Sequence, residues 1–364
     1  RIMIAMALVM EPGLLIADEP TTALDVTTQA NILRLIKEIQ RRRGMGVLFI
    51  THDFGVVADI ADRVVVMQEG KIVEQGTVNE VLKNPSHEYT KMLIGSVPSM
   101  KPPKRDQVSG SPALITKQIN KTFGGLGFFG KGRKVHAAKS VSFDIRAGET
   151  TGIVGESGSG KSTVARCVIR LIDPNSGKIL INNIDVAKLK ESKLRPLRNN
   201  FQIVFQDPYR SLNPRRTVGQ SIIEGPTNFG IPLAEATQRA KDLMNIVGLQ
   251  TDSLERFPHQ FSGGQRQRIC IARALAMEPQ ILIADEAVSA LDVSVQAQVL
   301  ELLDDVKKKF DLAMLFITHD LRVAAQVCDN IVVMREGEIV ERGSTYEIYS
   351  LSLIHISEPT RPLS

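Results

Sequence analysis

A chain of 364 residues has room for about two domains. Its 43% hydrophobic and 23% charged residues are ordinary for a soluble globular protein, and it contains no run of 18 apolar residues that could span a membrane. The formal net charge of +5 is modest and Trp is absent, so neither a basic groove nor base-stacking rings for nucleic acid are expected.

An internal repeat divides the chain. Residues 1–26 match residues 268–293, and this register, an offset of 267 residues, continues without a gap for about 75 residues. Two copies of one domain are therefore predicted, and the first is expected to lack its front half. We expect the C-terminal half of the first copy at 1–95, a linker rich in Pro, Ser, Lys and Arg at 96–112, and the second copy at 113–350.

The elements within the two copies are predicted in the same order. The apolar runs 14–17 and 281–284 are typical of parallel strands that are covered on both faces. After them we expect one helix, one strand and one hairpin in each copy, with the helices at 27–41 and 294–309, the strands at 47–50 and 313–317, and the hairpins at 63–76 and 330–343.

The remaining parts of the second copy are less regular. A strand is predicted from Ala113, and a glycine-rich basic loop at 124–134 precedes a strand at 141–145. Pro-rich turns and amphipathic helices fill residues 207–262, which predicts a helical insertion into an α/β core. The tail at 351–364 departs from the preceding pattern, and we expect it to be non-native.

The stretch GESGSGKST matches the phosphate-loop pattern G-x-x-x-x-G-K-[ST]. The apolar run 151–154 precedes it, and a predicted helix with Val164, Cys167, Val168 and Leu171 on one face follows it. A glycine turn with a surface lysine is the structural alternative, but the flanking strand and helix favour an anion site. The residues expected to contact a nucleoside triphosphate are Gly155, Glu156, Ser157, Gly158, Ser159, Gly160, Lys161, Ser162 and Thr163, with Lys161 on the β- and γ-phosphates and Ser162 on Mg²⁺.

Two acids follow the predicted strand at 281–284, at the end where open α/β sheets bind ligands. Asp285 is expected to hold Mg²⁺ through water, and Glu286 is expected to polarise the attacking water as a general base. An Asp-Glu pair after a strand could instead be a helix cap. Its repetition as Asp18 and Glu19 favours the catalytic interpretation.

A second glycine turn, FSGGQRQR at 261–268, opens another predicted helix. Ser262, Gly263, Gly264 and Gln265 would place a hydroxyl group and backbone N–H groups at a helix N-terminus, which is a second anion site. The presence of two anion sites in one copy is explained if the second site contacts the γ-phosphate of a nucleotide that another copy holds.

These motifs, taken in order, resemble those of the ATP-binding-cassette (ABC) ATPases over residues 1–350. The resemblance implies a P-loop fold with a helical subdomain, in two tandem copies of which the first is truncated. It also implies that Gln206 contributes to catalysis and to the Mg²⁺ site, that His319 is the switch histidine, and that Glu19 and His52 are the counterparts of Glu286 and His319 in the first copy. Phe123 is expected to stack on adenine, with Phe128 and Phe129 as alternatives.

The family resemblance also implies partners. ABC cassettes pair head to tail and enclose two ATP molecules, each between one copy's phosphate loop and the other copy's signature, which here is FSGGQ at 261–265. This sequence contains one of each, so we expect neither sandwich to be completed within one chain. Ala287 stands where the first copy has Pro20, but the acids are retained, so hydrolysis is not expected to be lost.

The segments 84–98 and 206–215 are similar to those of the bacterial oligopeptide, dipeptide, nickel and glutathione importer ATPases. The expected function is ATP hydrolysis that energises import of peptides or glutathione-like solutes, at the cytoplasmic face of the inner membrane. Permease subunits and a solute-binding protein would be the partners, and nucleic acid would not. A soluble tandem cassette acting on DNA or the ribosome, and an inert fragment, are the alternatives.

Overall fold

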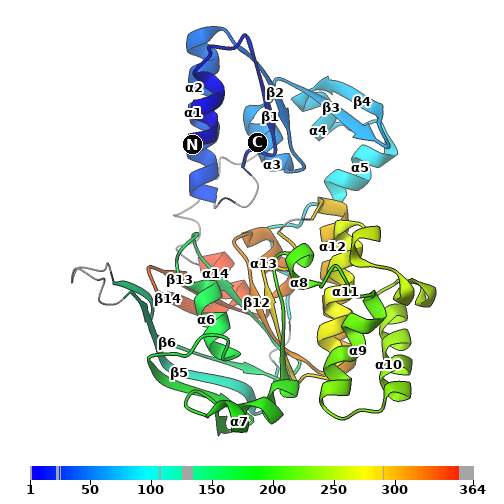
Figure 1. Cartoon of the computed structure of the whole chain (residues 1–364). Helices are drawn as coiled ribbons and strands as arrows, with labels where there is room; N and C mark the ends of the chain where they lie inside the picture. Colours follow the sequence, from blue (N-terminus) through cyan, green and yellow to red (C-terminus); the bar gives the residue numbers. More distant parts are fainter. Residues whose placement is uncertain are drawn as a thin grey trace. The chain divides into compact units, whose positions relative to one another are not determined.

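The computed structural model describes residues 2–21, 24, 26–105, 108–124, 134–289 and 291–351. It divides the chain into two compact units (Figure 1). The N-terminal unit comprises Arg1–Pro98 with Asp292–Ala297, and the C-terminal unit comprises Ser99–Leu291 with Gln298–Ser364. Within the described residues, no helix is both long enough and apolar enough to cross a bilayer.

A six-stranded sheet in the order β10-β11-β12-β7-β13-β14 is the centre of the C-terminal unit. Neighbouring strands are parallel except for β14, which forms an antiparallel hairpin with β13. All residues of β7, β11 and β12 are buried, and for β11 this is the coverage on both faces that the run 281–284 predicts. The strands are β7 Thr150–Val154, β10 Phe201–Val204, β11 Ile281–Asp285, β12 Ala313–Ile317, β13 Asn330–Arg335 and β14 Glu338–Ser344.

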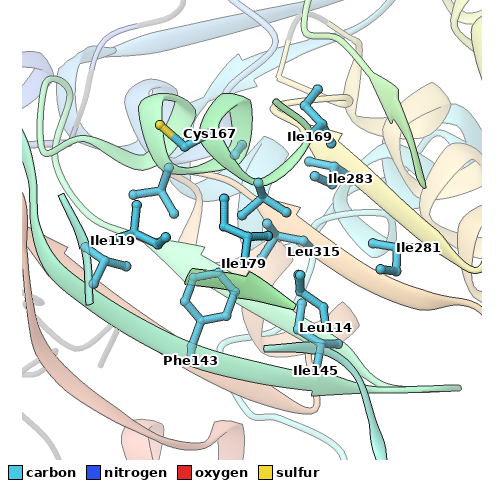
Figure 2. Packing of buried hydrophobic residues seen from close by; sticks show 14 of the residues in the cluster. Leu114, Ile119, Phe143, Ile145, Cys167, Ile169, Ile179, Ile281, Ile283 and Leu315 are labelled. Atoms are coloured by element: carbon cyan, nitrogen blue, oxygen red, sulfur yellow. The ribbon is translucent and has the colours of Figure 1, made fainter. Parts of the chain in front are cut away.

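An antiparallel sheet in the order β6-β5-β8-β9 lies opposite the central sheet, with helix α6 (Lys161–Val168) packed between the two. Figure 2 shows this core, to which the antiparallel sheet contributes Phe143, the central sheet Leu315 and α6 Cys167. The strands are β5 Pro112–Phe123, β6 Val135–Arg146, β8 Ser176–Ile181 and β9 Ile184–Asp185. The mixed α/β class expected from the sequence is confirmed.

The helix after the phosphate loop does not include all four residues that were predicted to share one face. Val164, Cys167 and Val168 lie on α6 and are buried, but Leu171 lies beyond its end and is half-exposed. The reason is that α6 ends at Val168 and Arg170 adopts a left-handed φ of +54°, which turns the chain out of the helix.

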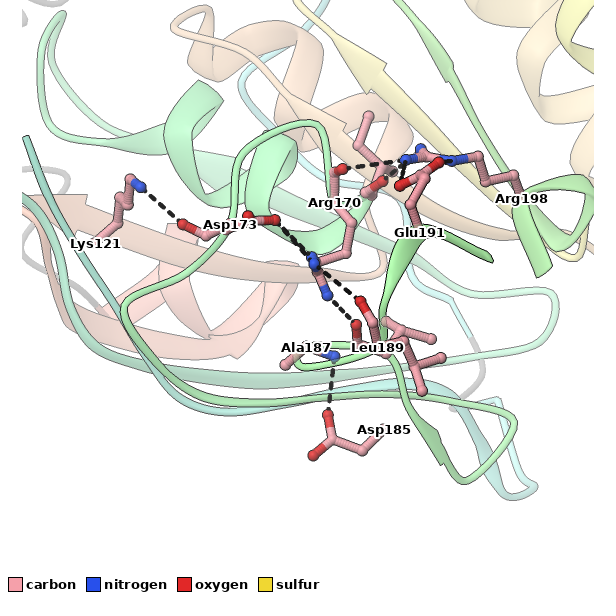
Figure 3. Close-up of polar contacts among 10 residues, drawn as sticks. Lys121, Arg170, Asp173, Asp185, Ala187, Leu189, Glu191 and Arg198 are labelled. Atoms are coloured by element: carbon pink, nitrogen blue, oxygen red, sulfur yellow. Dashed lines mark hydrogen bonds and ion pairs between the residues drawn. The ribbon is translucent and has the colours of Figure 1, made fainter. Parts of the chain in front are cut away.

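Polar contacts hold the chain after α6 in place (Figure 3). The Arg170 guanidinium donates to Asp173 Oδ1 at 2.9 Å and to the backbone carbonyl oxygens of Val186 and Leu189. Arg198 pairs with Glu191 Oε2 at 3.1 Å. These bonds fix the connection that leads from the phosphate-loop helix toward β10.

The region between β10 and β11 is helical wherever it is regular, as the predicted insertion at 207–262 requires. Helices α9, α10 and α11 pack against one another there (Figure 1). The elements are α8 Pro208–Ser211, α9 Val218–Asn228, α10 Leu233–Ile246, the 3-10 helices η2 Thr251–Glu255 and η3 Pro258–Gln260, and α11 Gly263–Leu275. The other helical elements of this unit are α7 Glu191–Leu194, η1 Arg195–Asn200, α12 Val293–Phe310, α13 Leu321–Val327 and α14 Thr345–Leu351.

The N-terminal unit has the element order of the second half of the C-terminal unit. Its β1 to β4, α2 and α3 begin and end 267 residues before β11 to β14, α12 and α13, respectively. The strand registers agree as well, including a bulge after Val66 and after Val333. The elements are α1 Ile2–Leu8, β1 Leu14–Asp18, α2 Val26–Arg43, β2 Gly46–Ile50, α3 Phe54–Ile60, β3 Arg63–Gln68, β4 Lys71–Thr77, α4 Val78–Lys83 and α5 Glu88–Gly95.

The expectation that the first of the repeated strands is covered on both faces is wrong. Leu14 and Ile16 of β1 are 56% and 61% exposed, whereas Leu15 and Ala17 are buried. In the C-terminal unit, α6 packs against both β11 and β12, and β7 pairs with β12 and β13. The described residues of the N-terminal unit include no counterpart of α6 or β7, so one face of β1 faces solvent.

Candidate functional site

The predicted phosphate loop connects β7 to α6, and its glycines fit tight backbone contacts. Gly155 and Gly160 have φ of +149° and +105°. A Cβ atom would lie 2.2 Å from the carbonyl oxygen of Met334 at Gly155 and 2.0 Å from that of Ala137 at Gly160. Since both clashes are with backbone atoms, larger residues would displace the loop from β6 and β13.

The loop offers hydrogen-bond donors to an anion. Gly160 is the N-cap of α6 and provides no side-chain cap, whereas α9, α11 and α13 are capped by Thr217, Ser262 and Asp320. The N–H groups of the first turn of α6 therefore remain for a ligand. The buried Ser159 hydroxyl has no hydrogen-bond partner among the described residues. Phosphate oxygens would satisfy both sets of groups, so the loop fits a triphosphate.

Lys161 lies across this loop. Its Nζ donates to the carbonyl oxygens of Gly155 at 2.6 Å and Glu156 at 2.9 Å, and the side chain is buried. The ammonium group is therefore held by the same loop whose N–H groups face the anion site. This is the placement expected for a lysine that contacts the β- and γ-phosphates.

Ser162 and Asp285, two of the predicted Mg²⁺ ligands, lie next to each other. The Ser162 hydroxyl donates to Asp285 Oδ1 at 2.9 Å, and Asp285 is only 4% exposed. Burial raises the pKa of the Asp285 carboxyl, and the nearby Glu286 charge raises it further, against the hydrogen bond from Ser162. A hydroxyl and a carboxylate are oxygen ligands of the kind that Mg²⁺ takes together with substrate phosphates, so this pair fits the ion.

The described residues contain no group of three or more His, Cys, Asp or Glu side chains that could hold a metal by themselves. A Mg²⁺ site formed by Ser162 and Asp285 would therefore depend on nucleotide oxygens and water, which is usual for this ion.

Glu286 and His319 form a pair beside the metal-ligand candidates. His319 Nδ1 lies 3.5 Å from Glu286 Oε1, and hydrogen bonding to His319 lowers the pKa of the Glu286 carboxyl. The backbone at Glu286 has a φ of +50°, and its N–H donates to the Ile317 carbonyl oxygen at 3.0 Å. A residue held in this sparsely populated conformation by its neighbours is typical of functional sites.

Gln206 is connected to this pair through a residue whose part in the site the sequence did not indicate. Gln206 Nε2 lies 3.5 Å from Ser289 Oγ, which donates to the Glu286 carbonyl oxygen at 3.0 Å. The Ser289 hydroxyl group therefore lies between Gln206 and the backbone of Glu286.

The signature residues lie at the start of α11, which packs against α8 and α9. Ser262 and Gln265 form a capping box, in which Ser262 Oγ accepts from the Gln265 N–H at 3.3 Å and Gln265 Oε1 accepts from the Ser262 N–H at 3.0 Å. Arg266 follows, and its guanidinium carbon lies 3.8 Å from the Tyr209 ring centroid. The structure does not place these residues in the cluster formed by Ser162, Asp285, Glu286 and His319.

The candidate adenine ring partner lies at the end of β5. Phe123 is partly exposed, and Lys121 Nζ lies 5.1 Å from its ring centroid. The alternatives Phe128 and Phe129 lie outside the described residues, so Phe123 remains a prediction.

The N-terminal unit contains a Glu–His pair that corresponds to Glu286 and His319. His52 Nδ1 lies 2.9 Å from Glu19 Oε1, and the Glu19 N–H donates to the Ile50 carbonyl oxygen at 2.9 Å. Glu19 also has a positive φ, of +43°. Asp18 is exposed at the end of β1.

Comparisons with known proteins agree with the motifs. The ABC transporter family model matches residues 138–289, and the model of the oligopeptide/dipeptide transporter C-terminal region matches residues 73–129. The chain is 45% identical over 399 aligned positions to the glutathione import ATP-binding proteins GsiA of Shigella flexneri and Escherichia coli (strain K12). These alignments cover 99% of this chain and 64% of the relatives, so the chain spans less than two thirds of their length.

Solved ABC structures have the same fold. The dimeric ATP-binding cassette MJ0796 in a post-hydrolysis state bound to ADP and Pi aligns with a TM-score of 0.57 and 29% identity, over 64% of this chain and 98% of that one. The cbiO1 protein of Clostridium perfringens, part of the ABC transporter complex cbiONQ, aligns with a TM-score of 0.57 and 29% identity over 66% and 92%. The chain thus contains an ABC transporter ATPase domain, together with the C-terminal region found in oligopeptide and dipeptide transporters.

Proposed function

We propose that this protein is the ATP-binding, ATP-hydrolysing subunit of a bacterial importer for peptides or glutathione-like solutes. The observation that carries the proposal is the single cluster in which Ser162 meets Asp285 and Glu286 meets His319, beside the phosphate loop. The solute class comes from the relatives, which are named for glutathione import, and from the oligopeptide/dipeptide transporter region.

Each residue of the proposed site has a distinct role in ATP hydrolysis. Lys161 and the N–H groups of the phosphate loop hold the β- and γ-phosphates, and Ser162 and Asp285 hold the ion. When bound, Mg²⁺ neutralises the charge that develops on the phosphate oxygens. Glu286 accepts a hydrogen bond from the attacking water and polarises it, while His319 orients the Glu286 carboxylate.

Gln206 contributes in two ways in this proposal. It supplies a further oxygen to the ion, and through Ser289 it restrains the backbone at Glu286. The partners are permease subunits and a solute-binding protein, and the protein is placed peripherally at the cytoplasmic face of the inner membrane. Purification from the native host tests this assignment, since recovery with membrane proteins supports it and recovery with nucleic acid or ribosomes contradicts it.

Replacing Lys161 with Ala is expected to weaken Mg-ATP binding by about 10- to 100-fold, because each hydrogen bond to a charged group contributes about 1.5–3 kcal/mol. Isothermal titration calorimetry measures the affinity. Lys178→Ala, which removes an exposed lysine of β8, is the matched control and should bind as the unchanged protein does. Equal affinity in the Lys161 variant would exclude this loop as the triphosphate site.

We further infer that the chain is built from two tandem cassettes, with the C-terminal half of one at 1–95, a linker at 96–112 and a second cassette at 113–350. The identical element bounds and strand registers at an offset of 267 residues support this inference. The residues 351–364 that we expect to be non-native lie outside the described part of the chain, except for Leu351.

A polypeptide of these 364 residues carries one phosphate loop and one signature, and both belong to the C-terminal unit. If cassettes pair head to tail, a sandwich requires two chains. The ATPase rate per molecule is therefore expected to rise with protein concentration until dimers dominate. Rates measured over a hundred-fold range of concentration test this, and a high rate that does not change with dilution would contradict it.

A further inference from the structure

Part of the predicted linker is bound to the C-terminal unit. Gln326, near the end of α13, donates from Nε2 to the carbonyl oxygens of Ser99 at 2.8 Å and Lys101 at 3.0 Å. Arg105 donates to the carbonyl oxygen of Gln326 and, through Nη1, to Asp329 Oδ1 at 3.3 Å. Both ends of the segment Ser99–Arg105, which we call the docked segment, therefore contact the C-terminal end of α13.

Asp329, the acid that pairs with Arg105, is also held by residues of β7 and α12. Asp329 Oδ2 accepts from the Thr150 N–H at 2.7 Å and from Lys307 Nζ at 3.4 Å. The Asp329 side chain is 13% exposed and that of Arg105 is 25% exposed. An ion pair that is largely shielded from water, with one partner already oriented by β7 and α12, is stronger than an exposed pair between two free side chains.

The corresponding helix of the N-terminal unit, α3, has a lysine of its own unit at its C-terminal end in place of a linker arginine. Asp59 of α3 is the counterpart of Gln326, and its carbonyl oxygen accepts from Lys37 Nζ of α2. The residue that corresponds to Lys37 in the second copy is Asp304, which pairs with Lys308 at 2.6 Å and Lys307 at 3.5 Å. A cation at a helix C-terminus is favourable, and α13 obtains it from the linker because α12 supplies an acid at this position.

We propose that the docked segment recognises the end of α13 in the second cassette and not the end of α3 in the first, and that its docking sets the length of the tether between the two cassettes. The proposal rests on the tandem arrangement inferred above. Its specificity comes from the exchange of Lys37 for Asp304, which leaves the carbonyl end of α13 open to Arg105.

Docking shortens the tether greatly. Helix α5 ends at Gly95 and the docked segment begins at Ser99, so the free connection spans at most about 14 Å. Once released, the chain from Gly95 to the start of β5 at Pro112 would have a root-mean-square length of about 20–25 Å and a maximum near 60 Å. Because the range that a tethered domain can reach depends on tether length, docking limits the separations that the two cassettes can adopt.

Tryptic cleavage after Lys104 in the whole protein reports docking, because Lys104 lies within the docked segment. Lys101, which lies in the same segment, precedes Pro102 and is resistant to trypsin. Gln326→Ala leaves the linker sequence unchanged, and we expect it to raise the initial cleavage rate at least about ten-fold, the effect of losing about 1.4 kcal/mol. Asp304→Lys should do the same, since it supplies the competing cation of α3, whereas Asp304→Asn and Lys37→Ala should not. Thermal unfolding and Mg-ATP binding show whether each variant is folded and retains its nucleotide site.

Spin labels measure the tether directly. Labels at Lys91 of α5 and Lys117 of β5, both exposed and replaced by cysteine, should give a narrow distance distribution in the unchanged protein and a broader one with Gln326→Ala. The three native cysteines are buried. Equal cleavage rates and equal distance distributions in the two proteins would overturn the proposal, even if the protein binds and hydrolyses ATP.

Discussion

Glu286→Gln is expected to bind Mg-ATP as tightly as the unchanged protein and to hydrolyse it at least about 100 times more slowly. The amide has the shape of the carboxylate and still offers an oxygen to His319, but it cannot polarise water as a base, and general-base catalysis contributes about 10²- to 10⁴-fold. The backbone should remain in place, because the Glu286 N–H is bonded to the Ile317 carbonyl oxygen and not to the side chain.

Phosphate release under single-turnover conditions, with binding measured in parallel, separates these two effects. Glu301→Gln, which removes an exposed carboxylate of α12, is the matched control and should leave the rate unchanged. A Glu286→Gln protein that hydrolyses ATP at the normal rate would remove Glu286 from the base role. Lost binding would show instead that the carboxylate holds the nucleotide complex.

The local parts of the site could be predicted because each is determined by a few consecutive residues. The glycines of the phosphate loop require φ values and backbone contacts that other residues do not allow, so the pattern around Lys161 indicates both the turn and the start of α6. The apolar run 281–284 in β11 places Asp285 and Glu286 at the carboxyl end of a buried strand. The ungapped repeat then predicts the bounds of β1 to β4 from those of β11 to β14.

The parts that could not be predicted depend on contacts between distant residues. Arg105 and Asp329 are 224 positions apart, and nothing near Arg105 in the sequence indicates that it binds an acid. The Ser289 bridge between Gln206 and Glu286 depends on how two loops meet above the sheet. The exposure of Ile16 follows from what packs on β1, which the apolar sequence of the strand does not specify.

Asp285→Asn is expected to make the protein more stable without Mg-ATP. Burial raises the pKa of the Asp285 carboxyl, so the stability linked to this group is fully present below its unfolded pKa and is lost as the pH rises through the raised folded value. At pH 7 the ionised, buried carboxylate therefore opposes folding. Asn keeps the shape and can accept from the Ser162 hydroxyl, but it carries no charge.

With Mg-ATP bound, the unchanged protein should be more stable than the Asp285→Asn variant. A ligand at 100 times its Kd stabilises the folded state by about 2.7 kcal/mol, and the Asp285→Asn variant, which has no carboxylate at this position to hold the ion, forgoes much of this gain. For a unit of this size each kcal/mol corresponds to a shift of about 2–4 °C in Tm. Thermal unfolding is measured with and without Mg-ATP, at pH 7 and at lower pH. The variant should have a higher Tm than the unchanged protein only without ligand, and this difference in Tm should shrink as the pH falls. Asp18→Asn, at the exposed counterpart position, should leave Tm unchanged under both conditions. A variant that is less stable than the unchanged protein without ligand would mean that Asp285 supports the fold, and that a bound ion is not what compensates for burying its charge.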